Sequence, residues 1–198
     1  MLGLPSTTEV GRRLPKEAFY RNLKLEAKTR AEFVHLIEAI TIANSIKATT
    51  VNLGDGESVH EIMVLSVLLK GEEQPRRAIE AITKANPHKL VFHTEPTGTT
   101  FVFRKALYSS QVIESLTLAD STLDEAWDSI CSQIVFADVD GADVDGRIDR
   151  ARRRAALEAE ITALDQRARK ATQISRKNEL FAQLARKKRE LHALGKEN

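Results

Sequence analysis

The last quarter of the chain has the simplest hydrophobic pattern. Residues 147–194 contain no glycine or proline, and their apolar positions recur at spacings of three, four or seven, as in helices that pack along a narrow seam. We predict an antiparallel helical hairpin, a coiled coil, over residues 147–198, with arms of about 23 and 19 residues. The register breaks near Thr172 and Ser175, either of which would cap the second helix. The seam consists of Leu157, Ile161, Leu164, Ala168 and Ala171 in the first arm and Leu180, Leu184, Leu191 and Leu194 in the second.

The preceding region mixes helical and strand patterns. Thr29 and Glu32 have the spacing of a capping box, and the apolar residues after them follow a helical period. Asn86 and Pro87 end a second helical segment. The predicted helices are residues 30–46, residues 75–85, and a third helix that begins after a cap at Ser121 or Thr122.

Short β-branched and apolar runs predict the strands. The run 62–69 is apolar apart from Ser66, which is typical of a central strand that is covered on both faces. It would form a hairpin with residues 49–53 around the turn at 54–56. Further turns are predicted at 96–98 and 108–110. The remaining predicted strands are residues 89–94, 99–107 and 111–118.

Together these elements predict an α+β fold. It has a mostly antiparallel sheet of about five strands with three helices, followed by the C-terminal antiparallel hairpin. Nine of the ten aromatic residues precede position 137, so the packed core is expected there. We divide the chain into an α+β domain (1–136), an acidic Asp/Gly hinge (137–146) and a basic hairpin (147–198). Residues 1–27 are expected to form an extended arm with a short helical turn at 16–22.

Charge divides the chain in the same place. Residues 147–198 hold 15 lysine and arginine residues against 7 acidic residues, whereas residues 1–146 hold 15 against 21. The formal net charge of +2 therefore conceals two parts of opposite sign. This split favours a protein that docks onto a partner.

Two cationic runs in the tail are the candidate binding residues. Neither run contains an acidic residue, so each favours an acidic partner, either a protein surface or a phosphate backbone. The competing interpretation is a simple solvated helix face. Phe181 is the only aromatic residue in the tail, which argues against stacking on single-stranded nucleic acid. The candidates are Arg152, Arg153, Arg154, Arg186, Lys187, Lys188 and Arg189.

Other motifs give little evidence of chemistry. Cys131 lies among apolar residues and is expected to pack in a helix, so no disulfide framework is expected and a reducing, cytoplasmic setting fits. The five histidines lack metal-ligand spacing, and no phosphate-binding or dinucleotide motif occurs. No signal peptide and no membrane span is predicted. We therefore expect no catalytic residue, no metal and no cofactor.

The tract ADVDGADVDG at 137–146 superficially resembles a calcium loop. A calcium loop needs acids at its first, third and fifth positions, glycine at the sixth and glutamate at the twelfth. Counted from Asp138, the first and third positions match, but Ala142 and Asp143 occupy the fifth and sixth. A solvated acidic hinge fits the tract better than a calcium site does.

A metal-dependent nuclease of the restriction-enzyme type is the enzyme class with the nearest pattern. Asp55 and Glu61 precede a strand that ends at Lys70. That chemistry needs a carboxylate two positions before the lysine, and here the position is Leu68, which cannot bind a metal. The pattern therefore favours at most a degenerate nuclease.

Several segments resemble those of an uncharacterised bacterial family, known only as a domain of unknown function. They are MLGLPSTTEV, LPKEAFY, HEIMVLSVLLKG and ITALDQRARKATQISRKNELFAQLARKKREL, which lie along essentially the whole chain. The resemblance implies a gene neighbourhood of helicases and DNA methyltransferases in restriction-type or anti-phage systems, and it assigns no catalytic residue. Similar sequences commonly have a glutamate before the lysine of the central strand, which this chain lacks.

The leading hypothesis is a non-catalytic accessory subunit of such a defence complex. It would bind a helicase or methyltransferase through its α+β domain and basic hairpin. The alternative is direct binding of duplex nucleic acid by the hairpin, and the seam also permits pairing between two copies of the chain. A degenerate metal-dependent nuclease is the third hypothesis.

Overall fold

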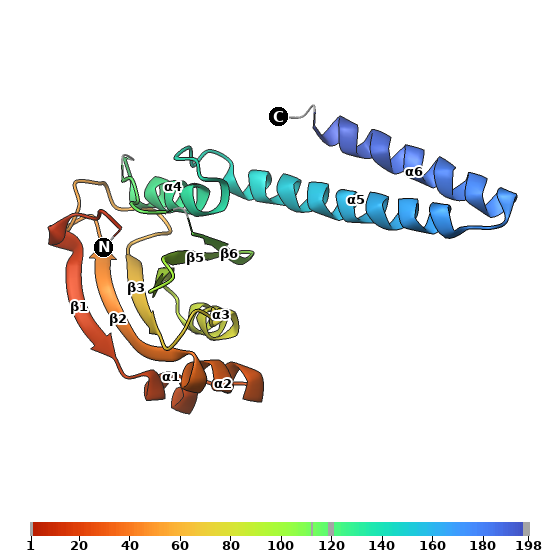
Figure 1. The fold of residues 1–198 in the computed structure, drawn as a ribbon. Coiled ribbons are helices and arrows are strands. Elements are labelled where there is room, and N and C mark those ends of the chain that lie inside the picture. The colour runs from red at the N-terminus through yellow and green to blue at the C-terminus, as the bar shows by residue number, and fades with distance from the viewer. Residues whose placement is uncertain (1, 112, 119–120, 196–198) are drawn as a thin grey trace. The chain divides into compact units, whose positions relative to one another are not determined.

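The computed structural model describes residues 2–111, 113–118 and 121–195 and contains two compact units. Residues 1–142 form the first unit and residues 143–198 the second. Figure 1 shows the first unit as a curved sheet with helices and the second as a pair of long helices. The fold is α+β, and the described residues form six strands and six α-helices.

The first unit is built on one mixed sheet with strand order β1-β2-β3-β4-β5-β6. All neighbouring strands are antiparallel except β3 and β4, which are parallel and are connected by α3. The strands are β1 (Glu9–Leu14), β2 (Ile37–Ile46), β3 (Ile62–Leu69), β4 (Lys89–Glu95), β5 (Thr99–Arg104) and β6 (Ala106–Ser110). The helices are α1 (Lys16–Asn22), α2 (Ala27–His35), α3 (Arg76–Ala85) and α4 (Leu123–Phe136), and a 3-10 turn, η1 (Ser6–Thr8), precedes β1.

Both faces of the central strands contain buried apolar residues. On one face, Ile40, Leu65 and Phe92 belong to a buried cluster that includes Phe33 of α2 and Ile79 of α3. The opposite face contains Val64, Val91 and Val102, which are paired across β3, β4 and β5 and are fully buried. Helix α4 contacts β5 and β6. The predicted central position of strand 62–69 is therefore confirmed, but the face that contains Val64 is only partly covered, because Leu68 on that face is exposed.

Helix α4 begins as its sequence predicts. Thr122 accepts a hydrogen bond from the backbone N–H of Glu125, and the Glu125 carboxylate accepts one from the N–H of Thr122, which completes a capping box. The loop at Gly54 is attached to the same helix end, because the Gly54 N–H donates to Ser121 and the Gly54 carbonyl accepts from Leu123. The start of α4 thus holds the segment that precedes β3.

The second unit is a helical hairpin of α5 (Val144–Lys170) and α6 (Ile174–Leu194). The two helices pack together along most of their length. Leu157 and Ala168 of α5 and Leu180 and Leu184 of α6 are buried, which places the seam where the sequence pattern predicts it. The predicted cap at Thr172 or Ser175 is wrong, because Gln173 occupies the cap position without a side-chain hydrogen bond.

The predicted helix over residues 30–46 is wrong. The helix ends at His35, and Ile37–Ile46 forms β2, a strand between β1 and β3. The apolar residues at 33, 37 and 40 fit a helical period, but Ile40, Ile42, Asn44 and Ile46 are buried at every second position. The predicted capping box also fails, since Glu32 accepts a hydrogen bond from the backbone N–H of Ala78 in α3.

Other predicted elements shift for local reasons. Residues 49–53 form turns, and β3 pairs with β2 on that side. The predicted strand 99–107 is divided at Lys105, whose φ of 60° reverses the chain between β5 and β6. Residues 108–110, predicted as a turn, therefore belong to β6. The predicted strand 111–118 has no strand among its described residues, and position 112 lies outside the described residues.

The N-terminal arm also contains an unpredicted strand. Glu9–Leu14 forms the sheet edge β1, and five of its six residues are exposed, so they carry no alternating hydrophobic signal. The short helix at Lys16–Asn22, the helix at Arg76–Ala85, the strand at Lys89–Glu95 and the turn at 96–98 agree with the predictions within a residue or so.

Candidate functional site

The hairpin brings the two predicted cationic runs to the same end. Arg153 of α5 donates from Nη2 to Oε1 of Glu190 in α6 over 3.3 Å. The two residues are 37 positions apart in the sequence, and the antiparallel arrangement places the first half of α5 beside the C-terminal part of α6. Residues 152–154 and 186–189 therefore lie in the same part of the hairpin, which we call the cationic end of the hairpin.

Three of the seven candidate residues are held by carboxylates within the hairpin. Lys187 lies 2.8 Å from Glu160 and 3.5 Å from Glu190, and Arg154 lies 3.0 Å from Glu158. The hydrogen bond from Arg153 and the charge of Lys187 lower the pKa of Glu190. The hydrogen bond to Glu160, together with the charges of both glutamates, raises the pKa of Lys187. Of these pairs, only Arg153–Glu190 and Lys187–Glu160 connect the two helices, and the others lie within a single helix.

The other four candidates are available to a ligand. Arg152, Arg186, Lys188 and Arg189 are exposed, and none has an ion-pair partner among the residues that the structure describes. Arg186 also lines a hollow of about 310 Å³ with Leu164. These four cations give the cationic end of the hairpin an excess of positive charge that no described carboxylate pairs.

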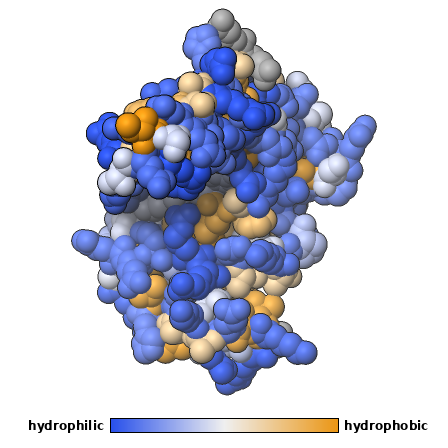
Figure 2. All heavy atoms as spheres, turned by 90° about the vertical axis from the view of Figure 1, so that its right-hand side faces the viewer, coloured by the Kyte–Doolittle hydropathy of each residue, from blue (hydrophilic) through white to orange (hydrophobic). Residues whose placement is uncertain are grey.

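The surface view agrees with a polar character. Figure 2 shows one face of the molecule, on which hydrophilic side chains predominate and hydrophobic ones form only scattered patches. Few large apolar residues of the hairpin are exposed, chiefly Ile174 and Phe181. The described surface of the hairpin is therefore mainly polar, with little exposed apolar area.

The residues of the nuclease pattern have separate structural roles. Lys70 donates through Nζ to the carbonyl of Val34. Leu68, at the position where that chemistry needs a carboxylate, is 42 % exposed. Asp55 contacts His60, and Glu61 contacts Ser45 and Lys47. Among the described residues, no three His, Cys, Asp or Glu side chains are close enough together to hold a metal ion.

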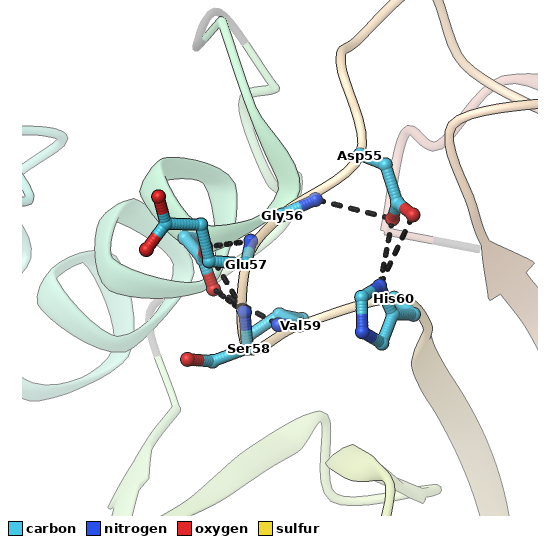
Figure 3. A network of polar contacts seen from close by, with 7 residues as sticks. Asp55, Gly56, Glu57, Ser58, Val59 and His60 are labelled. Carbon is cyan, nitrogen blue, oxygen red and sulfur yellow. Dashed lines mark hydrogen bonds and ion pairs between the residues drawn. The ribbon is translucent and has the colours of Figure 1, made fainter.

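The loop that contains Asp55 is fixed by a carboxylate of α4. Asp124 accepts hydrogen bonds from the consecutive backbone N–H groups of Glu57, Ser58 and Val59, at 2.6, 3.3 and 2.9 Å. Figure 3 shows this loop, with both carboxylate oxygens of Asp55 beside Nδ1 of the His60 ring. These charge-assisted hydrogen bonds anchor the loop backbone to the start of α4.

Glu61 stands at the centre of a second polar cluster, which the sequence reasoning missed. Its carboxylate accepts a 2.5 Å hydrogen bond from Ser45, and it lies 3.3 Å from Lys47 and 3.7 Å from Nδ1 of His88. Burial alone would raise the pKa of Glu61, but the hydrogen bonds from Ser45 and Lys47 outweigh it and hold the pKa below its usual value. Glu61 is therefore ionised and compensated at neutral pH.

These side chains surround a cavity of about 360 Å³. It lies where β2 ends and where the parallel strands β3 and β4 begin. Lys89 at the start of β4 lines it, with its ammonium 5.7 Å from the ring centroid of Trp127. The cavity is lined by Lys47, Ser58, Val59, His60, Glu61, Pro87, His88 and Lys89. These residues come from three separate segments of the sequence, and the strand order brings the segments together. No single sequence motif therefore identifies the cavity.

A row of polar side chains crosses the sheet on the face that contains Val64. Cross-strand pairing aligns Thr41, Ser66, His93 and Thr100, and Nδ1 of His93 lies 3.0 Å from the Thr100 hydroxyl. Burial lowers the pKa of His93, against the opposing charge of Glu95. A shallow hollow of about 580 Å³ lies beside the row and is lined in part by Glu9 and Asn44.

Cys131 has the packed position that its neighbours predict. It is fully buried in α4, and burial raises the pKa of its thiol to about 12. The thiol is therefore protonated at neutral pH, and the thiolate is the reactive form of cysteine.

None of the helices in the described residues is long and apolar enough to cross a bilayer.

Comparison with known proteins connects these features to one family. The model of a domain of unknown function, DUF4391, matches residues 2–191. The chain belongs to the DUF4391 family. The match includes both the sheet unit and nearly all of the hairpin, so the hairpin is part of the DUF4391 domain. Neither the curated proteins nor the solved structures include a match.

Proposed function

We propose that this DUF4391 protein is a non-catalytic accessory subunit of a bacterial restriction-type or anti-phage complex. It binds a helicase or DNA methyltransferase partner through its α+β unit and the cationic end of its hairpin, in the cytoplasm. The observation that supports binding is the convergence of two distant cationic runs, joined by Arg153 and Glu190, with four exposed cations that lack a counter-charge among the described residues.

The class of partner follows from the family resemblance described above. Segments such as HEIMVLSVLLKG imply a gene neighbourhood of helicases and methyltransferases. The non-catalytic role is supported by Asp55, Glu61 and Lys70, which are each bonded to other groups of the same unit. An acidic surface on the partner would complement the hairpin charge.

Co-purification with the products of the adjacent genes tests this proposal. A tagged full-length chain is expected to retain the helicase or methyltransferase subunit. The triple substitution Arg152→Gln, Arg186→Gln and Arg189→Gln should release it. The triple substitution Arg167→Gln, Lys170→Gln and Lys177→Gln is a matched control, because it removes the same charge from exposed residues at the opposite end of the hairpin. Equal retention by both variants would contradict the proposal.

Direct binding of duplex nucleic acid is the second candidate, and the same convergence of arginines favours it. Duplex phosphates attract clustered cations, and the affinity falls steeply with salt. Fluorescence anisotropy with a labelled DNA duplex at several salt concentrations measures this slope. Substitution of Arg152, Arg186, Lys188 and Arg189 should reduce the slope by about 0.9 for each phosphate contact that is lost. Absence of binding at low salt would exclude this candidate.

A further inference from the structure

We propose that the cavity beside Glu61 binds a phosphate group. The proposal does not depend on the hairpin, because all the lining residues belong to the sheet unit. The cavity volume of about 360 Å³ is sufficient for a small phosphorylated ligand. Nothing in the proposed docking of the hairpin uses these residues.

The charges of the lining favour an anion. Lys47 and Lys89 are cations, His60 and His88 contribute imidazole rings, and Glu61 is the only carboxylate among the lining residues. The charges of Glu61 and Lys47 offset each other, and the Ser45 hydroxyl donates a hydrogen bond to the same carboxylate, so the net positive charge of the lining comes from Lys89. Lys89 has no carboxylate partner among the described residues, and its ammonium lies over the Trp127 ring. An incoming anion therefore meets uncompensated positive charge.

The backbone around the cavity is preorganised in the absence of a ligand. Two of its sides are the ends of paired strands, and a third is the loop that Asp124 holds through three backbone hydrogen bonds. Glu61 draws Lys47 and His88 to the same side of the cavity. Preorganised donors of this kind lose less conformational entropy when they bind than mobile surface lysines do.

A phosphate group matches the donors that are present. Its oxygens accept several hydrogen bonds, and lysine ammonium and imidazole N–H groups are suitable donors. Asp55 faces Nδ1 of His60, so the other ring nitrogen, Nε2, remains for the ligand. The ligand could be free phosphate or the phosphate of a nucleotide, and these two sources share the recognition chemistry.

The test is a titration of the full-length protein with inorganic phosphate and, separately, with adenosine monophosphate at constant ionic strength. Amide chemical shifts resolved by residue should change at Lys47, His60, His88 and Lys89. Tighter binding of the nucleotide would identify a nucleotide phosphate as the source, and equal or weaker binding would identify free phosphate. Absence of changes at the cavity with both probes would overturn the proposal.

Variants separate this cavity from the cationic end of the hairpin. Lys47→Gln and Lys89→Gln should each weaken phosphate binding about tenfold or more, since each removes a charged donor. Arg186→Gln with Arg189→Gln should leave the shifts at the cavity unchanged. Lys84→Gln, an exposed lysine of α3 paired with Glu80, is the control for net charge within the same unit. Equal weakening by Lys84→Gln and Lys89→Gln would contradict a specific site, and circular dichroism verifies that each variant is folded.

Discussion

Glu190 accepts a hydrogen bond from Arg153 and also lies 3.5 Å from Lys187, so one carboxylate connects α5 to α6 and both cationic runs to each other. Each cationic run therefore contains both residues that pair within the hairpin and residues that remain unpaired in the part of the chain that the structure describes. Arg153 and Lys187 stabilise the hairpin, whereas Arg152 and Arg189 project charge that has no counterpart among the described residues. Substitutions within one run should therefore have different effects.

The hairpin seam should determine hairpin stability. Leu180 is 3 % exposed in α6. Leu180→Ala should destabilise the hairpin by about 2 to 5 kcal/mol, because it removes buried methyl groups and leaves a cavity. Thermal unfolding followed by circular dichroism measures the loss. Lys188→Ala, an exposed change on the same helix, should alter the free energy of unfolding by no more than about 0.5 kcal/mol, and a comparable loss there would show that the seam is not decisive.

The loop 55–60 should depend on Asp124. Asp124→Ala removes the acceptor of three backbone hydrogen bonds and should cost at least about 1.5 to 3 kcal/mol in the free energy of unfolding. Urea denaturation measures this change. Glu57→Gln changes an exposed side chain of the same loop and should have an effect within about 0.5 kcal/mol. Similar values for the two variants would contradict the role of Asp124.

Glu61 should make the protein sensitive to acid. Its folded-state pKa lies below the ordinary value of 4.5, so the unfolded chain takes up a proton first as the pH falls. The stabilisation is therefore present above pH 4.5 and is lost as the pH falls through the lowered pKa. The wild type should have a larger free energy of unfolding than Glu61→Gln at pH 7. In acid, the two values should become equal. A difference that is independent of pH would contradict this assignment.

His93 should add a second, milder pH dependence. Burial lowers its pKa below the ordinary 6.5, so the folded state disfavours the proton that the unfolded chain accepts. Stability is retained above pH 6.5 and decreases as the pH falls from there toward the folded-state pKa. His93→Gln should abolish the portion of the decrease that begins at pH 6.5. Urea denaturation of both proteins between pH 7.5 and 5 tests it, and identical profiles would refute the role of His93.

The sequence predicts best where one element contains its own signal. The hairpin seam, the run Ile62–Leu69 and the Thr122 cap are local patterns, and the structure contains each of them. Ile37–Ile46 misleads because its isoleucines satisfy a helical period when they are combined with Phe33, while tertiary pairing with β1 and β3 makes the segment a strand. The edge strand Glu9–Leu14 is mostly exposed and has no pattern to detect.

The candidate sites divide in the same way. The cationic runs are visible in the sequence, but their convergence requires the antiparallel hairpin. The cavity around Glu61 is not visible, because Lys47, His60 and His88 lie on separate segments that only the order β2-β3-β4 brings together. Charged residues can be counted from the sequence, but which opposite charges lie beside them depends on the fold.

Trp127 is the only tryptophan of the chain, and its ring lies beneath the ammonium of Lys89, one of the cavity residues. It is also one helical turn after Asp124, the residue that fixes the cavity loop. Indole emission responds to nearby charge, so a phosphate that draws Lys89 away from the ring would alter the fluorescence of the native protein. If the cavity binds phosphate as we propose, Trp127 would serve as an intrinsic fluorescent reporter of its occupancy, without an external label.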